Sequence, residues 1–474
     1  MPPMALNHIA AYIKREIPAV VIDVYNADYA AEYSPLISSY LYAKVHAEYV
    51  KRLNDPDDIV WRQLRRVISD FKPDVLGVSA MTASYVSALR VCCVAKEINP
   101  DIKVVLGGKH PTALPEDTLK NKVVDCVVIG EGEETFRDFI LNQACPENVP
   151  GMAYAEKSGA IVVNTARPYI RDIDKLPVPI FDSSINTYDY EGQGDPDLYT
   201  WSIVTARGCP FQCVYCASDK NVRFRSPDNV IREILQVKAE YGISRFCFED
   251  DSFTLNSDRA RDLCEKLKKA KVRWMCNTRV DLLSDAMVDV MQRSGCESIA
   301  IGIETGSPKT LKRINKKIDL DKIERAIRLL KARGVLVTGY FIIGFPWETR
   351  EDIDETMRLV ERLPLDDFQL NVATPLPGTQ LFESLAQSGK IRLDGEDWAR
   401  YHQGSLHMNF SVYPDEVWQA MISEYLYSAH VIYKKKMLRK MLRMFLSDPA
   451  VMAKKIVNKV VVGCRYHLRL RAML

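Results

Sequence analysis

Three cysteines stand close together in the segment Arg207-Gly-Cys-Pro-Phe-Gln-Cys-Val-Tyr-Cys, directly after a predicted strand. Intervals of three and two residues allow the thiolates of Cys209, Cys213 and Cys216 to meet at one soft metal centre. A tetrahedral zinc site or a fully ligated four-iron cluster needs a fourth ligand, and no fourth cysteine lies nearby in the sequence. Three thiolates on a four-iron cluster leave one iron free to bind and reduce a small molecule. The alternatives are a zinc site completed by a distant histidine and three unrelated thiols.

Length and composition narrow the class of protein. The chain has 474 residues, enough for about three domains, and its net charge of +2 gives no overall attraction to nucleic acid. No stretch approaches the roughly 20 apolar residues of a membrane span. The first residues lack the pattern of a secretory signal, and twelve cysteines without such a signal indicate a reducing compartment. We therefore expect a cytoplasmic protein.

The first part of the chain, residues 1–150, alternates apolar strands with amphipathic helices. Near-continuous apolar strands predict a doubly wound α/β domain with a parallel sheet. Glycine and other small residues follow the strands, at the carboxyl ends where such sheets bind ligands. The expected strands cover 19–25, 75–81, 103–108 and 126–132, and the expected helices cover 4–15, 38–71, 83–97, a short stretch from 112, and 133–142.

The next segment, 151–195, is expected to be a hairpin (151–164) followed by a linker. A second βα series occupies 196–394, and six strands predict a partial (β/α)6 barrel of the TIM type, open on one side. The remainder, 395–474, is expected to be helical and basic. The expected barrel strands cover 201–206, 245–250, 272–277, 297–303, 335–343 and 367–373, and the helices between them cover 228–241, 257–270, 284–294, 319–333 and 349–362.

Polar residues follow the predicted barrel strands and are expected to face one site. Adjacent acids close the second strand, where they suit an amino group or another cation, and an arginine ending the third suits a carboxylate. One of these acids capping the helix from Ser257 is the alternative. Each of these residues alone is a weak signal, since polar residues often end turns. They are Glu249, Asp250, Asp251, Asn277, Arg279, Glu304, Gly344 and Asn371.

The cysteine triplet, with the aromatic Tyr215 before its last cysteine, resembles the radical S-adenosylmethionine (SAM) superfamily. The resemblance implies that the free iron of a 4Fe-4S cluster chelates SAM. It also implies that one-electron reduction releases a 5′-deoxyadenosyl radical, which removes hydrogen from an unactivated carbon. The SAM-binding residues it implies are Tyr215, Asp250, Asp251, Asn277, Arg279, Glu304, Gly344 and Asn371.

Further runs resemble the branch of that superfamily with an N-terminal cobalamin-binding domain. They lie at 246–253, 302–306 and 375–379 in the barrel and at 75–82, 107–112 and 130–133 before it. An ordinary doubly wound domain with glycines in tight turns is the alternative. The Asp-x-His-x-x-Gly cobalt-ligating signature is absent, and the chain starts on a helix where relatives have a strand. The implied cobalamin-binding residues are Ser79, Met81, Thr82, Gly107, Gly108, Gly130, Glu131 and Gly132.

By this resemblance the chain is expected to catalyse cobalamin-dependent C-methylation. Radical cyclisation, rearrangement or dehydration without methyl transfer is one alternative, and a non-catalytic metal-binding or redox-sensing protein is another. The expected partners are a small-molecule or lipid-like substrate and an electron donor such as flavodoxin or ferredoxin, and no nucleic acid. Residues 431–474 hold twelve Lys or Arg and one acid, so a peripheral contact with an anionic membrane is weighed against an ordinary solvated helix face.

Overall fold

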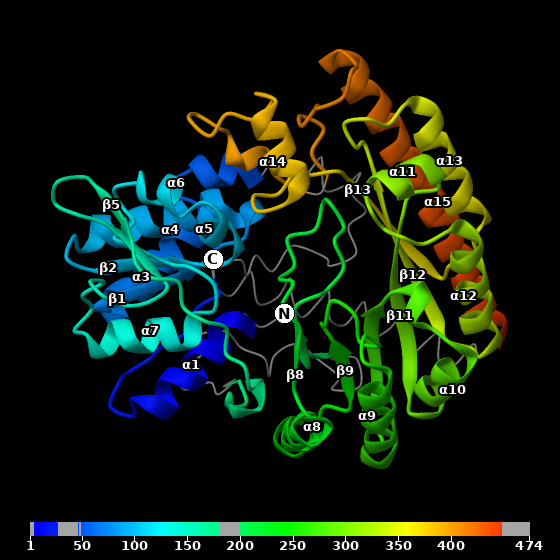
Figure 1. The fold of residues 1–474 in the computed structure, drawn as a ribbon, viewed down its shortest axis with the longest axis horizontal. Helices are drawn as coiled ribbons and strands as arrows, with labels where there is room; N and C mark the ends of the chain where they lie inside the picture. Colours follow the sequence, from blue (N-terminus) through cyan, green and yellow to red (C-terminus); the bar gives the residue numbers. More distant parts are fainter. Residues whose placement is uncertain (1–3, 27–45, 47–48, 180–199, 403, 448–474) are drawn as a thin grey trace.

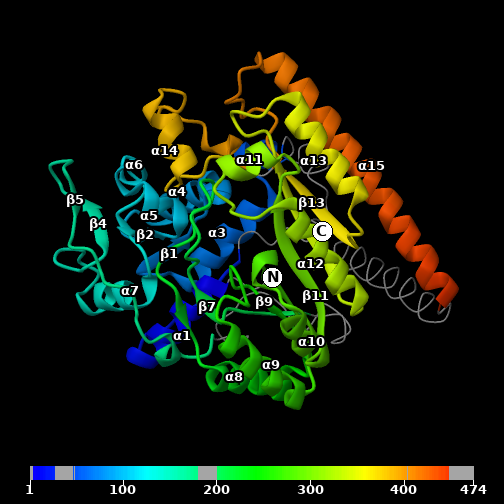
Figure 2. The same cartoon turned by 45° about the vertical axis from the view of Figure 1, so that its right-hand side comes forward.

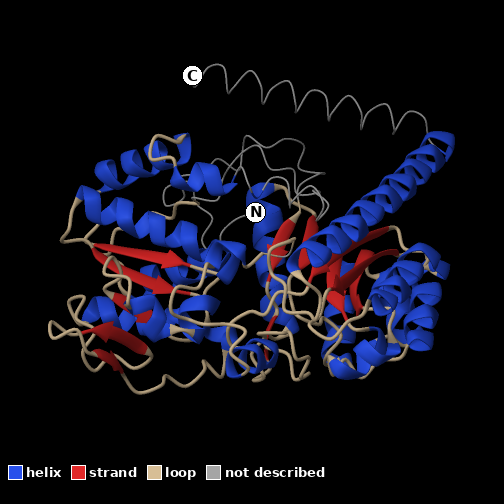
Figure 3. Ribbon diagram, turned by 90° about the horizontal axis from the view of Figure 1, so that it is seen from above, coloured by secondary structure: helices blue, strands red, loops and turns tan. Residues whose placement is uncertain are grey.

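The computed structural model describes residues 4–26, 46, 49–179, 200–402 and 404–447. Two α/β units lie side by side, with the strands of their two sheets in separate halves of the molecule (Figures 1 and 3). This arrangement confirms the expected fold class of a doubly wound domain, a partial barrel and a helical C-terminal region.

The N-terminal sheet has three parallel strands followed by an antiparallel hairpin. Its order is β1-β2-β3-β4-β5, from β1 (Val75–Ser79) through β2 (Lys103–Gly107) and β3 (Cys126–Val128) to β4 (Met152–Ala155) and β5 (Ile161–Val163). Alternate side chains of β2 enter two different hydrophobic clusters, so both faces of the sheet are covered. Helices α3 (Ile59–Phe71) and α4 (Tyr85–Ile98) pack together, and α1 (Met4–Glu16) packs on α7 (Gly132–Leu141).

Three local predictions for this unit are wrong. Residues 19–25 form no strand, because only Val24 makes an isolated bridge. Strand β1, whose apolar sequence predicts a buried strand, is therefore at the edge of the described sheet and is partly exposed. The short helix expected from Thr112 is replaced by α5 (Lys109–Ala113) and α6 (Pro115–Leu119). Gly108, with φ 112°, starts the first of these helices early because it turns the chain directly after β2. Of the helix predicted at 38–71, residues 38–45, 47 and 48 lie outside the described residues. The described part is helical at 49–54 and in α3, and it is interrupted at 55–58.

The second unit is a six-stranded parallel sheet that curves into a partial barrel. Its order is β13-β12-β11-β10-β9-β6, and β6 and β13 remain edge strands in the described part of the chain. The strands are β6 (Trp201–Ile203), β9 (Arg245–Phe248), β10 (Arg273–Thr278), β11 (Cys296–Glu304), β12 (Leu336–Ile343) and β13 (Asp367–Val372). The helices are α8 (Pro227–Tyr241), α9 (Ser257–Ala270), α10 (Asp285–Arg293), α11 (Pro308–Arg313), α12 (Leu320–Ala332) and α13 (Arg350–Arg362).

The C-terminal helices join and cover these two units. Helix α14 (Gln380–Gln387) lies beside α4 and α6 of the N-terminal unit in two views (Figures 1 and 2), and Trp398 contacts the rings of Tyr85 and His110 there. Helix α15 (Asp415–Ser447) packs along β13 and α13. Among the described residues, every helix is too short or too polar to cross a lipid bilayer.

Candidate functional site

The three cysteines lie on one long loop at the carboxyl end of the first barrel strand. After β6 the chain forms a two-residue ribbon of β7 (Ala206–Arg207) and β8 (Arg223–Phe224), which pairs Arg207 with Arg223. We call residues 208–222, between these two strands, the cysteine loop. All three cysteines are half-buried. Their position matches the face on which barrels of this kind carry their chemistry.

Backbone hydrogen bonds close the cysteine loop at its base. The Cys209 N–H donates to the Asp219 carbonyl at 2.7 Å, and the Cys216 N–H donates to the Cys213 carbonyl at 3.1 Å. Gly208 has φ 89°, and a Cβ at this position would lie 2.4 Å from the Asn221 carbonyl oxygen. Only glycine fits here without moving one end of the loop relative to the other.

Residues from two barrel loops hold the far side of the cysteine loop. The Val214 N–H donates to the Ile314 carbonyl at 3.2 Å, and the Asn315 side-chain amide donates to the Gln212 carbonyl at 2.9 Å. The Arg279 guanidinium carbon lies 3.7 Å from the centre of the Phe211 ring. These contacts hold the loop over the ends of β10 and β11.

The donor set fits an iron–sulfur cluster better than a single metal ion. Among the described residues, no three His, Cys, Asp or Glu side chains converge closely enough to hold one ion. A cubane does not need this convergence, because each thiolate binds a different iron. Burial raises the pKa of the Cys209 and Cys216 thiols, so a bound cation must offset this effect for both to bind as thiolates.

The three acids after β9 have different surroundings. Asp250 is 1% exposed, and its carboxylate accepts the backbone N–H groups of Thr205 at 2.6 Å and of Ala206 at 2.8 Å as well as the Thr205 hydroxyl. Asp250 therefore holds the turn from β6 to β7, and these three donors engage its carboxylate. Glu249 and Asp251 are exposed. The alternative that one of the acids caps α9 is wrong, because the Asn256 side chain does so.

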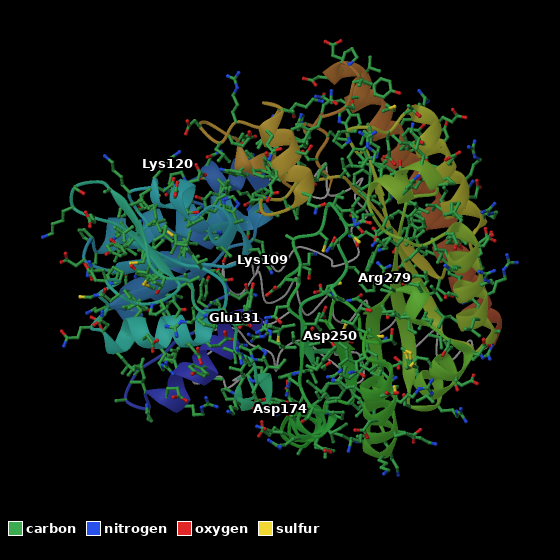
Figure 4. The ribbon with its side chains drawn as sticks, viewed as in Figure 1. Lys109, Lys120, Glu131, Asp174, Asp250 and Arg279 are labelled. Atoms are coloured by element: carbon green, nitrogen blue, oxygen red, sulfur yellow. The ribbon has the colours of Figure 1, made fainter. Side chains whose placement is uncertain are left out.

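Arg279 is bound within the protein. Its guanidinium forms two hydrogen bonds of 3.0 Å with Asp281 and a third, of 2.9 Å, with the Lys316 carbonyl. The side chain is buried against the cysteine loop (Figure 4). In this geometry Arg279 supports the cysteine loop, whereas the sequence predicts that it binds the carboxylate of a ligand. Asn277, on the preceding strand, is half-buried and its carbonyl accepts the Phe253 N–H.

Glu304 ends β11 in an unusual backbone conformation beside Lys316. Its φ is 71°, and the register of β11 against β12 shifts next to it. The Lys316 ammonium lies 2.6 Å from Glu304 Oε1, and a Cβ on Gly302 would lie 2.2 Å from that oxygen. Burial raises the pKa of Tyr215 well above its usual value, and the nearby Glu304 carboxylate acts in the same direction. These contacts bring Tyr215 and Glu304 together, as the sequence predicts, and add Lys316.

The end of β12 supplies a second fixed turn. Glu348 is 1% exposed and accepts the backbone N–H groups of Gly344 at 2.7 Å and of Phe345 at 3.1 Å. Gly344 has φ 86°, and a Cβ there would lie 2.6 Å from the Trp418 ring on α15. Asn371, on the adjacent β13, is half-buried. The C-terminal helix thus packs directly on the loop predicted to bind SAM.

The predicted cobalamin-binding residues line the carboxyl edge of the N-terminal sheet. Ser79, Met81 and Gly130 are exposed there, and Met81 keeps 56% of its surface accessible. A Cβ on Gly130 would meet nothing within 4 Å, so this backbone is open to a large flat ligand. The half-buried Gly107 and Gly108 lie between them. An exposed apolar side chain beside accessible glycine backbone fits the edge of a corrin ring.

Three of the predicted cobalamin-binding residues are engaged in contacts within the protein. The Thr82 hydroxyl is buried, 3.3 Å from His110 Nδ1. A Cβ on Gly132 would meet the Ile9 side chain of α1 at 2.9 Å. The Glu131 carboxylate is bound by arginines of the barrel, and this differs most from the expectation because it joins the two units (Figure 4).

Four residues of this site are not predicted from the sequence. Arg207, Arg223, Lys316 and Glu348 carry contacts that hold the predicted residues in place. Their partners are distant in sequence, except in the case of Glu348. A glutamate four residues after Gly344, following Phe-Pro-Trp, was the one local signal available.

Comparisons with known proteins agree with this architecture. A family model of the radical SAM superfamily matches residues 203–360, and a model of the B12 binding domain matches residues 1–140. The chain is 35% identical over 361 residues to an uncharacterized methyltransferase of Pyrococcus horikoshii, an alignment that covers 74% of this chain and 78% of the relative. It is 31% identical over 356 residues to the anaerobic magnesium-protoporphyrin IX monomethyl ester cyclase of Rubrivivax gelatinosus, covering 71% of this chain but only 62% of the cyclase.

Two solved structures have the same fold. The radical SAM methyltransferase TsrM from Kitasatospora setae, with cobalamin and a [4Fe-4S] cluster bound, has a TM-score of 0.61 at 18% identity and covers 77% of this chain and 74% of its own. The cobalamin-dependent SAM radical enzyme OxsB, with aqua-cobalamin and SAM bound, has a TM-score of 0.62 at 18% identity. That alignment covers 86% of this chain and 69% of OxsB.

Proposed function

Because the chain belongs to the radical SAM superfamily, in the branch that carries a B12-binding domain, we propose that this enzyme methylates an unactivated carbon of a small molecule. When bound, the cluster supplies an electron for cleavage of SAM, and cobalamin supplies the methyl group. The non-catalytic alternative is set aside because relatives of the chain are a methyltransferase and a cyclase.

The observation that carries the proposal is the contact between the two candidate cofactor surfaces. The exposed loop at Gly130 is followed by Glu131, whose carboxylate lies 2.6 Å from Arg207, two residues before Cys209. The cobalamin edge and the base of the cysteine loop are therefore in direct contact. Fixing two reacting centres in one arrangement removes much of the entropic cost of bringing them together.

The chain's own residues are proposed to bind and orient the ligands. Cys209, Cys213 and Cys216 hold the cluster, and the exposed Glu249 and Asp251 bind the SAM amino group. Each of these carboxylates also accepts a serine hydroxyl, from Ser202 and Ser218 respectively. The turn at Gly344 offers backbone to SAM from the other side of the barrel. Asp250, Arg279 and Glu304 position these loops from behind, since the partners described above already engage their charges.

Radical cyclisation without methyl transfer is the second candidate, favoured by the likeness to the magnesium-protoporphyrin monomethyl ester cyclase. The methyltransferase relative is more similar over more of its own length, which favours methylation.

Transfer of a methyl group to cobalamin separates these candidates without knowledge of the substrate. The full chain is reconstituted with iron, sulfide and hydroxocobalamin, reduced with titanium(III) citrate and given SAM labelled in its methyl group. A methylating enzyme moves the labelled methyl group from SAM to the reduced cobalt and releases one S-adenosylhomocysteine per bound cobalamin. Release of 5′-deoxyadenosine without S-adenosylhomocysteine would favour the cyclase-type reaction.

The partners beyond a substrate and an electron donor are also proposals. Flavodoxin or ferredoxin is the proposed donor, and the cytoplasmic location stays a prediction.

Near the end of the described chain, α15 exposes Lys434 and Lys435 beside Leu438, which is 67% accessible. This mixture of cationic and apolar groups suits an anionic lipid surface. The protein is expected to cosediment with phosphatidylglycerol vesicles but not with phosphatidylcholine vesicles. Failure to cosediment with either kind of vesicle would contradict the contact.

A further inference from the structure

One carboxylate of the N-terminal unit binds both ends of the cysteine loop. Glu131 Oε1 lies 2.6 Å from Arg207 Nη1, and Glu131 Oε2 lies 2.7 Å from Arg223 Nη1. Arg207 and Arg223 are paired across the ribbon of β7 and β8, where the cysteine loop begins and ends. The fifteen residues that carry the cluster ligands are thus tied at their base to a single side chain of the other unit.

Neighbouring groups add further hydrogen bonds to this junction. The Ile170 N–H donates to Glu131 Oε2 at 2.9 Å, and the Ile170 carbonyl accepts from Arg223 at 2.9 Å. Arg207 also reaches Glu133 Oε1 at 2.5 Å. The side chains of Glu131 and Arg223 are only 14% and 7% exposed, so water screens these charges poorly.

The backbone on the other side of the same carboxylate is open. Gly130 is exposed, has φ 83° and donates its N–H to the Thr112 hydroxyl at 3.0 Å. A ligand resting on this backbone contacts the residue directly before Glu131. Ordering of the Gly130 turn and ordering of the cysteine loop therefore restrict the same short segment.

We propose that Glu131 is a positioning residue that couples the cobalamin surface to the cysteine loop. A ligand that orders one side lowers the entropic cost of ordering the other, so cobalamin and the cluster bind cooperatively. The inference rests on the binding of these two cofactors and does not depend on the substrate or on methyl transfer.

The coupling is measured as a ratio: the dissociation constant of hydroxocobalamin without the cluster divided by its dissociation constant with the cluster. Hydroxocobalamin is titrated into the full chain with its cluster reconstituted, and into the same chain after the iron is removed by a chelator. Wild-type protein is expected to bind hydroxocobalamin at least about five-fold more tightly with the cluster, at the lower end of typical couplings between sites. In Glu131→Gln the amide keeps the shape but loses the charge, and the ratio is expected to fall to about one.

Asp138→Asn is the matched control. Asp138 also accepts two arginines, Arg137 at 2.6 Å and Arg167 at 2.5 Å, and is similarly part-buried, but these pairs do not involve the cysteine loop. This variant is expected to keep the wild-type ratio. A merely structural role of Glu131 would lower the melting temperature and leave the ratio intact.

A second variant tests the same contact from the barrel side. Arg207→Gln removes the pair with Glu131 but leaves the pair between Glu131 and Arg223, so it is expected to lower the ratio. Adding Arg207→Gln to Glu131→Gln is expected to lower the ratio no further, because Glu131→Gln already removes the shared pair. A wild-type ratio retained in either variant that melts cooperatively would overturn the inference, as would a ratio of one in wild-type protein. Failure of wild-type protein to bind hydroxocobalamin at all would instead contradict the proposed function.

Discussion

Lys316 and Glu304 form an ion pair in which both side chains are less than a tenth exposed, with 2.6 Å between Nζ and Oε1. Lys316 also presents its carbonyl to Arg279, which stacks on Phe211 of the cysteine loop. The pair thus stands behind the loop that carries the cluster ligands. Each charge stabilises the other, because both groups are too poorly solvated to stay charged without the partner.

Removing one member of this pair is expected to destabilise the protein strongly. In Lys316→Met the Glu304 carboxylate stays buried without its cation, which typically costs about 3 kcal/mol or more. The free energy of unfolding in urea is the measurement. The double variant Lys316→Met with Glu304→Gln is expected to recover part of the loss, and a purely additive loss would show that the pair is not coupled.

The Glu348 carboxyl predicts a specific pH dependence of stability. Burial raises its pKa from 4.5 to about 7, while the N–H groups of Gly344 and Phe345 oppose this shift. The folded protein therefore retains a proton that the unfolded chain has already released. This contribution to stability is fully present below pH 4.5, the unfolded value, and is lost as the pH rises through about 7.

Glu348→Gln removes that dependence because the amide does not titrate. The free energy of unfolding of the variant minus that of wild type is expected to rise by about 3 kcal/mol between about pH 4 and about pH 8. Urea denaturation at several pH values gives this difference. Glu351→Gln, an exposed change on the following helix, is the control and should follow the wild-type curve. Parallel curves for wild type and Glu348→Gln would refute the assignment.

Gly208 predicts a defect confined to the cysteine loop. In Gly208→Ala the new Cβ would lie 2.4 Å from the Asn221 carbonyl oxygen, so the two ends of the loop must separate. The reconstituted protein is expected to hold less than half of the wild-type iron. Gly159→Ala has the matching φ of 86° and open space around the Cβ, so it should cost only about 1 kcal/mol and leave the iron content unchanged. Normal iron in Gly208→Ala would show that the loop tolerates the displacement.

Much of the barrel could be predicted from the sequence because its signals are local. The helix predicted at 257–270 has those bounds in the structure, and its N-cap Asn256 precedes it directly. The cysteine loop was predicted at the end of β6, because six strand-and-helix repeats fix where each strand ends. Local periodicity and capping determine both features.

Predictions failed where a distant partner decides the outcome. Residues 19–25 are rich in β-branched side chains typical of a strand, yet only Val24 forms a β-bridge there. Glu131 and Arg207 are 76 residues apart in sequence, so nothing near Glu131 indicates that an arginine of the barrel binds it. The hydrogen bonds of Asp250 were unpredictable for the same reason. Their donors, the N–H groups of Thr205 and Ala206, lie more than 40 residues earlier.

The central claim is that the cysteine loop carries the cluster that cleaves SAM, and one measurement tests it most directly. The full chain is reconstituted anaerobically with iron and sulfide, reduced with dithionite and given SAM, and 5′-deoxyadenosine is quantified. Wild-type protein and Cys145→Ala, a change at an exposed cysteine away from the loop, are expected to form it. Cys213→Ala is expected to form none while keeping a cooperative thermal transition, and undiminished 5′-deoxyadenosine from this folded variant would contradict the account.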